Sequence, residues 1–401
     1  MDKTRLTIRY AAHQLAYWAA AAGVMSFATT YLLQRGFPAA QVGTIMALGA
    51  ILSCLTQPVL AARADRSPRL LFPLIVGLTV FCGGCFACVL LPRLPRTIFA
   101  LLYLLGVWAF DAMMPLLNAV CVRFLALGCP INYGVCRAAG ALSFAVAALG
   151  IGYLMEQTGE NSMIFLSLAL LAVCVVITLG YPRGGDVTAQ AEETAQSCSV
   201  PEFFRRYRWY CASLAGILLL GMFHAMTENY LIAIFERLGG GSSNVGVALF
   251  IPTVVEAVVM VYFSRIRQKI SDNWLLRWAG ITFLAKSLVF LFAPSIGVIY
   301  AAQLLQATSY GFLSPTQMYY ADSKVHRSDM VKGQAFITAA YSLGCAMGNF
   351  AGGVLVQHCG VVTMLAAGVG MAAAGTAVLF VTVEKKDAYT AQQETTQGAV
   401  T

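Results

Sequence analysis

The sequence predicts an all-α membrane protein with twelve transmembrane helices in two related six-helix halves. Three observations lead to this fold class. Of the 401 residues, 59% are hydrophobic and only 11% are charged, against about a quarter charged in an ordinary soluble domain. The hydrophobic residues form blocks of about twenty, the length that crosses a hydrocarbon layer about 30 Å thick. Two short sequence patterns also recur about 200 residues apart, as related halves would require.

The apolar blocks predict the helices in chain order. The first block is too long for the core of a signal peptide and is not followed by a small-residue cleavage site, so we expect it to be retained as helix 1. The twelve predicted spans are 10–33, 39–61, 70–91, 97–121, 134–155, 162–181, 209–234, 243–263, 274–293, 297–320, 334–355 and 361–383.

A long polar segment separates helices 6 and 7. It runs from about Pro182 to Arg208, is rich in Thr, Ala, Gln and Glu, and predicts a flexible cytoplasmic linker. We therefore expect an N-terminal bundle over 1–181, a linker over 182–208, a C-terminal bundle over 209–383 and a tail over 384–401.

Internal repeats support this division. Residues 36–43 are echoed by residues 239–246, since both begin with glycine and end with Val-Gly at the same spacing, 203 residues apart. Residues 152–159, at the end of helix 5, resemble residues 353–360, at the end of helix 11, with an offset of 201 residues. Parallel six-helix repeats build one large class of transporter, whose substrate site lies near the midplane where the halves meet.

The basic charge predicts topology. A net charge of +8 is compatible with nucleic-acid binding, but the Lys and Arg residues lie in short loops between apolar blocks, so we expect no nucleic-acid partner. Twenty of the 26 Lys and Arg residues lie on the same side of the membrane as the N-terminus in the predicted topology. The positive-inside rule then places both termini in the cytoplasm of a multi-pass protein of a cell inner membrane. We expect the lipid bilayer as its surroundings and a monomer as its state.

Metal, redox and nucleotide chemistry have little support. Among the twelve cysteines, Cys82, Cys85 and Cys88 have helical spacing inside an apolar block, which favours helix packing over metal binding. The sequence has no Walker loop, Rossmann glycine pattern or His-Glu zinc motif. We expect no cofactor, no metal and no enzymatic activity, so energy for uphill transport would come from an ion gradient or from exchange.

The segment after helix 2 resembles a family signature. Residues 61–69, Ala-Ala-Arg-Ala-Asp-Arg-Ser-Pro-Arg, are similar to the major facilitator motif G-x-x-x-D-R-x-G-R, with Ala61 and Pro68 in place of its glycines. The retained Asp65 and Arg66 imply a conformational latch, in which Asp65 contacts helix ends and Arg66 contacts nearby groups.

A second resemblance covers both halves. Pro115-Leu-Leu-Asn118-Ala, the segment 133–140 (Tyr-Gly-Val-Cys-Arg-Ala-Ala-Gly) and Gln57-Pro58 are similar to the branch that holds lactose permease, the nucleoside permeases and the phenylpropionate permease. This resemblance implies the major facilitator fold and a substrate-binding role for Arg137. It also aligns Lys286 and Glu256 with functional residues of helices 9 and 8.

Some residues differ from the pattern of that branch, and these differences limit what the resemblance implies about substrate and proton coupling. Asn118 stands in place of a helix 4 carboxylate, and Gln306 and Ser309 stand where helix 10 would carry a coupling His and Glu. Galactoside specificity and that particular proton site are therefore not implied.

Charged residues inside the predicted spans are the strongest candidates for function, since a charge at mid-bilayer costs a few kcal/mol and is normally paired or faces a cavity. Glu256 lies about thirteen residues into helix 8, near mid-membrane, and we expect it to pair with Lys286 of helix 9, opposite Arg137. Asp111 and Asn118 are seven apart on helix 4, which puts both on one face. A fixed structural pair is the alternative for Asp111, and snorkelling to the interface is the alternative for Arg137.

Two polar patterns complete the site. His224 and Glu228 are four apart on helix 7, so the pair is suited to taking up and releasing a proton. Gln303 and Gln306 belong to a polar stripe on helix 10, which suits either a hydroxylated solute or helix–helix contact. The predicted substrate-binding residues are Asn118, Arg137, Glu256, Lys286, Gln303 and Gln306. The predicted proton-coupling residues are Glu256, Asp111, Glu228 and His224.

These observations favour a secondary transporter that works by alternating access. The first hypothesis is proton-coupled uptake of a small polar organic solute such as a sugar, nucleoside or aromatic acid. The alternatives are a proton-driven exporter of drugs or metabolites, a membrane sensor that does not transport, and a membrane-embedded enzyme. Sugars, nucleosides and aromatic acids are all compatible with these residues.

Overall fold

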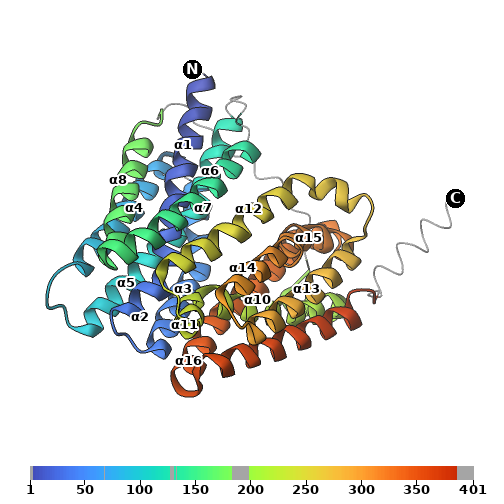
Figure 1. Cartoon of the computed structure of the whole chain (residues 1–401). Helices are drawn as coiled ribbons and strands as arrows, with labels where there is room; N and C mark the ends of the chain where they lie inside the picture. Colours follow the sequence, from blue (N-terminus) through green and yellow to red (C-terminus); the bar gives the residue numbers. More distant parts are fainter. Residues whose placement is uncertain (1–2, 67, 127–130, 132, 183–197, 386–401) are drawn as a thin grey trace. The chain divides into compact units, whose positions relative to one another are not determined.

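The computed structural model describes residues 3–66, 68–126, 131, 133–182 and 198–385, and the regular elements within them are all helices (Figure 1). Nine helices of this described part are long and apolar enough to cross a membrane. The protein is therefore an all-α, multi-pass membrane protein, as the sequence predicts.

The count of nine is compatible with twelve crossings because two predicted helices are interrupted and two others are merged into one. Helix 1 consists of α1 (Lys3–Ala21), a π-helical turn η1 (Ala22–Ser26) and α2 (Ala28–Gln34). Helix 10 consists of α14 (Ile296–Gln303), η3 (Leu304–Ala307) and α15 (Tyr310–Lys324). Helices 11 and 12 form α16 (Met330–Thr382), divided at Gly360, whose φ is 83°.

The remaining helices follow the predicted order. In the first half they are α3 (Ala39–Arg66), α4 (Leu71–Val89), α5 (Arg96–Ala112), α6 (Met114–Ala126), α7 (Tyr133–Thr158) and α8 (Asn161–Leu179), with a short η2 (Pro68–Leu70). In the second half they are α9 (Val200–Arg206), α10 (Arg208–Asn229), α11 (Leu231–Arg237), α12 (Ser242–Arg267) and α13 (Asp272–Phe292), with a short η4 (Arg327–Asp329).

Some helices extend beyond their apolar blocks. Helix 1 begins at Lys3 rather than at residue 10, and α3 continues to Arg66 rather than stopping at residue 61. The predictions stopped where charged residues begin, but a helical backbone satisfies its hydrogen bonds equally well in the polar interface. Asp65 and Arg66 therefore end a helix instead of lying in a loop.

The described end of the predicted linker is helical, which corrects the prediction of a flexible segment there. Ser199 has an extended backbone (φ −66°, ψ 158°), and Pro201 follows at the start of α9, a position that suits proline. Phe203 is fully buried and lies 4.7 Å from the Tyr207 ring. This contact anchors α9, because burying a phenylalanine contributes about 1.5–3 kcal/mol.

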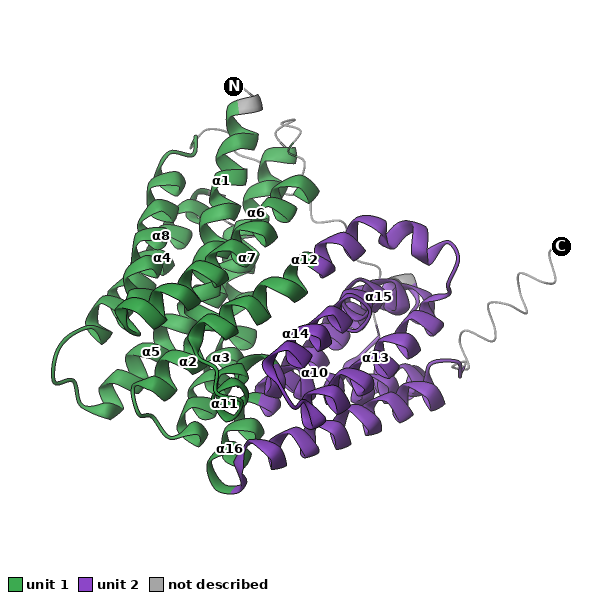
Figure 2. Cartoon of the chain, in the orientation of Figure 1, with its two compact units in different colours: residues 1–190, 228–254, 349–358 green, residues 191–227, 255–348, 359–401 purple. Residues whose placement is uncertain are grey.

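The contacts divide the chain into two compact units (Figure 2). Unit 1 contains residues 1–190, 228–254 and 349–358, and unit 2 contains residues 191–227, 255–348 and 359–401. Unit 1 thus holds α11, the first half of α12 and a short part of α16 beside the first eight helices.

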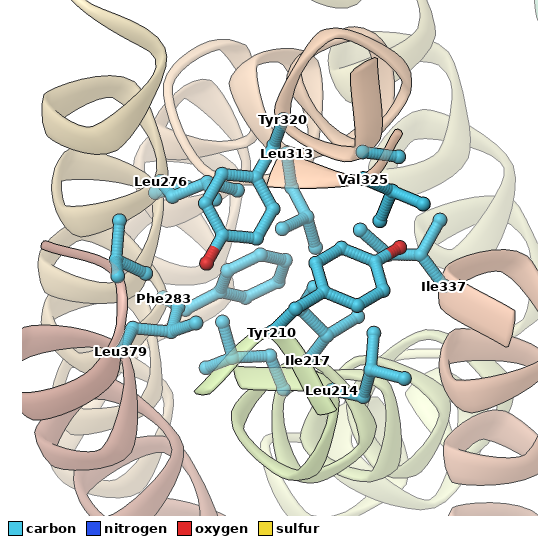
Figure 3. Close-up of a cluster of buried hydrophobic side chains, with 14 of the residues drawn as sticks. Tyr210, Leu214, Ile217, Leu276, Phe283, Leu313, Tyr320, Val325, Ile337 and Leu379 are labelled. Carbon is cyan, nitrogen blue, oxygen red and sulfur yellow. The ribbon is translucent and has the colours of Figure 1, made fainter. Parts of the chain in front are cut away.

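Each unit has an apolar core. In unit 1 a cluster around Tyr10, Ile75 and Phe124 joins α1, α4 and α6. In unit 2 the larger cluster includes Tyr210, Phe283 and Tyr320, which point toward one another from α10, α13 and α15 (Figure 3). These cores hold the helices that carry the polar residues described next.

Candidate functional site

Helix 4 breaks where proline removes a main-chain hydrogen bond. Pro115 has no N–H, and its ring crowds the carbonyl of the residue four positions earlier, Asp111. The helical hydrogen-bond pattern is interrupted at Met113, between α5 and α6, although Met113 keeps right-handed helical angles (φ −75°, ψ −25°). Gln57 of α3 donates from Nε2 to the Asp111 carbonyl oxygen at 3.1 Å, and the same nitrogen lies 3.5 Å from the carboxylate Oδ2. Gln57 thus satisfies the exposed carbonyl and holds the carboxylate of Asp111 against α3.

Asn118 has a different partner. The Tyr133 hydroxyl, at the start of α7, donates to Asn118 Oδ1 at 3.2 Å. Because Met113 keeps right-handed helical angles, the turn there does not separate the two side chains, and the shared face of Asp111 and Asn118 stays a prediction. Their roles in proton coupling and substrate binding stay predictions.

Arg137 of α7 stacks on an indole ring. Its guanidinium carbon Cζ lies 3.8 Å from the ring centroid of Trp18 in α1. Trp18 Nε1 donates to Gln14 Oε1 at 2.9 Å, and Gln14 Nε2 donates to the Tyr10 hydroxyl at 2.8 Å. These α1 residues are four apart and therefore lie on one helical face. The face of the guanidinium is engaged by the ring, whereas its N–H donors lie in the guanidinium plane.

Lys286 of α13 is a fully buried cation at the interruption of helix 10. Its side chain is 0% exposed, and Nζ donates to Gln306 Oε1 in η3 at 2.6 Å. Nζ also lies 5.5 Å from the Phe290 ring centroid. Gln303, one turn before Gln306, is likewise fully buried. The structure thus places two of the predicted substrate-binding residues, Lys286 and Gln306, in contact in unit 2.

Glu256 lies in the same unit. It is half-buried in α12. Its pairing with Lys286 stays a prediction. Arg137 belongs to unit 1, so the predicted placement of the pair opposite Arg137 also stays a prediction.

His224 lies among aromatic rings in unit 2. Its imidazole stacks on Tyr310 with centroids 5.1 Å apart and an interplanar angle of 9°. The rings of Phe283 and Tyr341 lie 6.0 Å and 6.2 Å away. α10 is continuous through Glu228, so the predicted spacing of one turn holds. Proton exchange by His224 and Glu228 stays a prediction.

The side chains of the predicted latch, Asp65 and Arg66, are not among those that the structure describes. Both residues belong to the last turn of α3. Their role as a latch stays a prediction.

The repeated glycines form two close helix contacts within unit 1, which we call the glycine seams. In the first seam, a Cβ at Gly43 of α3 would lie 2.3 Å from the Asn349 carbonyl oxygen, and one at Gly353 of α16 would lie 2.3 Å from the Ala39 carbonyl oxygen. Tyr230 adds a hydrogen bond from its hydroxyl to the Asn349 carbonyl oxygen at 2.8 Å. Only glycine permits main chains this close.

The second seam joins α7 to α12. A Cβ at Gly152 would lie 2.6 Å from the Ser242 carbonyl oxygen, and one at Gly246 would lie 2.6 Å from the Ala148 carbonyl oxygen. Each seam therefore pairs a glycine from one repeated pattern with a glycine from the other.

Sequence reasoning missed two aromatic residues of these sites. Trp18 had a usable signal, since it follows Gln14 by one turn on helix 1. Tyr341 had none, because its contact with His224 joins residues more than a hundred positions apart. Among the described residues, no group of three His, Cys, Asp or Glu side chains is placed to hold a metal ion.

A fully buried lysine bound to an amide of an interrupted helix, inside the spans of a multi-pass protein, is typical of a membrane transporter. The chain belongs to the MFS_1 like family, whose sequence model matches residues 7–367. It is therefore a secondary transporter of the major facilitator superfamily, with a small organic molecule as substrate, and is not an enzyme.

Two sequence relatives cover most of the chain. A maltose permease of Geobacillus stearothermophilus is 27% identical over 329 residues, which are 80% of this chain and 79% of the permease. The uncharacterized transporter YwbF of Bacillus subtilis strain 168 is 23% identical over 329 residues, 79% of this chain and 78% of the relative.

Solved structures share the fold at low identity. The nucleoside transporter NupG superposes with a TM-score of 0.80 at 14% identity, covering 96% of this chain and all of that structure. A bacterial homologue of the human lysosomal transporter Spinster, in an inward-facing and unoccupied conformation, gives a TM-score of 0.65 at 12% identity, covering 95% of this chain and 97% of that one. These likenesses support the major facilitator fold.

Proposed function

We propose that the protein is a proton-coupled symporter that takes up a small hydroxylated or carboxylated solute, in the class of sugars, nucleosides and aromatic acids. The observation that carries the proposal is Lys286, an ammonium that is 0% exposed inside a membrane span and bound to Gln306 at 2.6 Å. An intramembrane charge of this kind is costly and marks a substrate or ion pathway. Because Gln306 lies in the η3 interruption, the ammonium stands beside an irregular stretch of main chain, as in the binding sites of other secondary transporters.

The functions of two similar proteins agree with this solute class. One is a maltose permease and another is a nucleoside transporter. Maltose and a ribonucleoside both carry adjacent hydroxyl groups. The planar fork of Arg137 suits such a pair of oxygens, or a carboxylate, because it donates two parallel hydrogen bonds.

For proton coupling we propose Glu256 as the principal site. An ionised carboxylate inside a membrane span is costly unless it is paired or faces a cavity, so this position suits a group that alternates between its ionised and neutral forms. Protonation of Glu256 would change the electrostatic balance around Lys286, and substrate binding at Lys286 and Gln306 would respond to that change. Asp111, His224 and Glu228 are the other proposed proton sites.

Transport in proteoliposomes tests the proposal. Purified protein should accumulate radiolabelled maltose, uridine or phenylpropionate when an inward proton gradient is imposed, and a protonophore should abolish the accumulation. Glu256→Gln should lose accumulation yet retain exchange of labelled for unlabelled solute, whereas Glu236→Gln, an exposed carboxylate at the end of α11, should behave like the wild type. Transport driven outward by the same gradient would favour an exporter, and absence of flux for all three solutes would contradict the proposed class.

A further inference from the structure

We infer that Trp18 and Gly140 are positioning residues for Arg137, and that together they set the orientation of its guanidinium for a solute with two adjacent oxygen atoms. The inference rests on the proposed function, since it concerns the same site. Its basis is the geometry between α1 and α7, both of which belong to unit 1.

Gly140 leaves room for the indole ring. It follows Arg137 by three residues on α7, so both lie on one face of that helix. A Cβ at Gly140 would lie 2.6 Å from Trp18 Cδ1 and 3.2 Å from Trp18 Cγ. These atoms are at the stem of the indole, so relieving the clash requires movement of the whole ring. A side chain at position 140 would therefore move the surface on which Arg137 stacks.

The other contacts of Trp18 fix the ring from α1. Its Nε1–H donates to Gln14 Oε1 at 2.9 Å, which restrains rotation of the indole, and Gln14 is in turn bound to Tyr10. Tyr10 is 0% exposed in the core of unit 1. The position of the ring is thus tied to a rigid part of the fold.

The stacked arrangement determines which donors reach a ligand. With Cζ 3.8 Å from the ring centroid, the guanidinium lies over the indole, and a guanidinium that stacks on a ring directs its N–H bonds outward in its own plane. A fork held in this way suits a carboxylate or two vicinal hydroxyls, and it suits a single acceptor less well. Without the ring, Arg137 would sample more rotamers and bind the same solute more weakly.

Transport kinetics test this role in the full-length protein with whichever of maltose, uridine and phenylpropionate is transported. Trp18→Leu and Gly140→Ala should each raise KM about tenfold, as expected when a cation loses its aromatic partner, while the maximal rate changes less than about twofold. Trp18→Phe should restore most of the affinity. The matched control is Gly150→Ala in the same helix, where a Cβ would have nothing within 4 Å, and its KM should be unchanged.

A double variant separates positioning from a general structural role. If Trp18 acts through Arg137, adding Trp18→Leu to Arg137→Gln should raise KM no further than Arg137→Gln alone. If the two substitutions multiply their separate effects on KM, the inference is overturned. Equal loss of maximal rate and thermal stability in Trp18→Leu, without a change in KM, would also overturn it.

A measurement without substrate distinguishes failure of this inference from failure of the proposed function. In each protein, the fluorescence of Trp18 is the difference between the emission with Trp18 present and the emission after Trp18→Phe. Arg137→Gln and Gly140→Ala should each change this Trp18 fluorescence, whereas Gly150→Ala should not. An unchanged Trp18 signal in Arg137→Gln would refute the contact whatever the substrate is. If Arg137→Gln alters KM but Trp18→Leu and Gly140→Ala do not, the transport proposal stands and the positioning role is wrong.

Discussion

Asp329, between α15 and α16, is a buried carboxylate outside the membrane-spanning segments. It is 1% exposed and accepts hydrogen bonds from the Cys198 main-chain N–H at 2.9 Å and the Tyr207 hydroxyl at 3.0 Å, with Arg206 at 3.8 Å. Burial alone would raise its pKa, but the hydrogen bonds from Cys198 and Tyr207 and the charge of Arg206 outweigh burial and lower the pKa below its ordinary value of 3.8. The ionised carboxylate thereby ties the start of α9 to the α15–α16 connection.

This tie predicts an acid-dependent stability. Asp329→Asn should lower the free energy of unfolding at pH 7 by about 1–3 kcal/mol, because buried donors lose an ionised acceptor. A carboxylate whose pKa is depressed in the folded state stabilises above its unfolded pKa of about 4, and this stabilisation is lost as pH falls through the lowered value. The difference in melting temperature between wild type and variant should therefore be constant from pH 5 to 8 and shrink below pH 4.

The exposed Glu202 of α9 provides the control for that measurement. Glu202→Gln should leave the melting temperature within about 1 °C, since isolated surface charges contribute little. A difference between Asp329→Asn and the wild type that persists unchanged at pH 3 would contradict the ionised tie.

Among single residues, the sequence pointed to some members of the candidate site and not to others, for a physical reason. The cost of burying charge pointed to Lys286, and the helix 10 stripe pointed to Gln306, which the structure places in contact. Trp18 was missed although it follows Gln14 by one turn, because an aromatic residue in an apolar helix resembles the apolar residues around it. Its role depends on a contact with α7, which local spacing does not encode.

Among the helices and turns, the repeated glycines indicated two related halves, but the sequence did not predict which helices they would bring into contact. Gly36, Gly159, Gly239 and Gly360 all have positive φ and end helices or turn the chain. Gly43, Gly152, Gly246 and Gly353 form the seams. Helix interruptions were harder to predict: Pro115 explains the break in helix 4, whereas the η3 interruption has no proline within it.

The first seam predicts that small substitutions disturb transport strongly. Gly43→Ala places a methyl group 2.3 Å from the Asn349 carbonyl oxygen and should destabilise the closed seam by about 1–3 kcal/mol, as overpacking does. The transport rate should fall about tenfold or more while the protein still folds. Gly49→Ala in the same helix, where a Cβ would meet its nearest atom at an ordinary 3.5 Å, serves as the control, and an equal loss in both would contradict a specific role for the seam.

At the scale of the whole molecule, the fold class followed from the lengths of apolar blocks, because a bilayer admits few architectures. We propose that both termini are cytoplasmic, since 20 of the 26 Lys and Arg residues fall on that side. The proposed division into two six-helix halves follows from the repeats. The compact units mix segments of both, because contacts at the seams join α3 to α16 and α7 to α12 within unit 1.

Reporter fusions test the topology. A reporter active only in the cytoplasm should be active when fused at Thr401 or inserted between residues 182 and 198, and inactive when inserted at the α13–α14 connection, near Ser295. Activity of a periplasm-specific reporter at Thr401 would reverse the assignment.

The glycine seams have a thermodynamic consequence for such a transporter. Glycine and main-chain carbonyl groups have no side-chain rotamers, so a seam made from them gives up little conformational entropy when it closes. Closing such a seam therefore costs less free energy than closing an interface of the same area lined with long side chains. Weaker contacts are then enough to hold the two helices of a seam together.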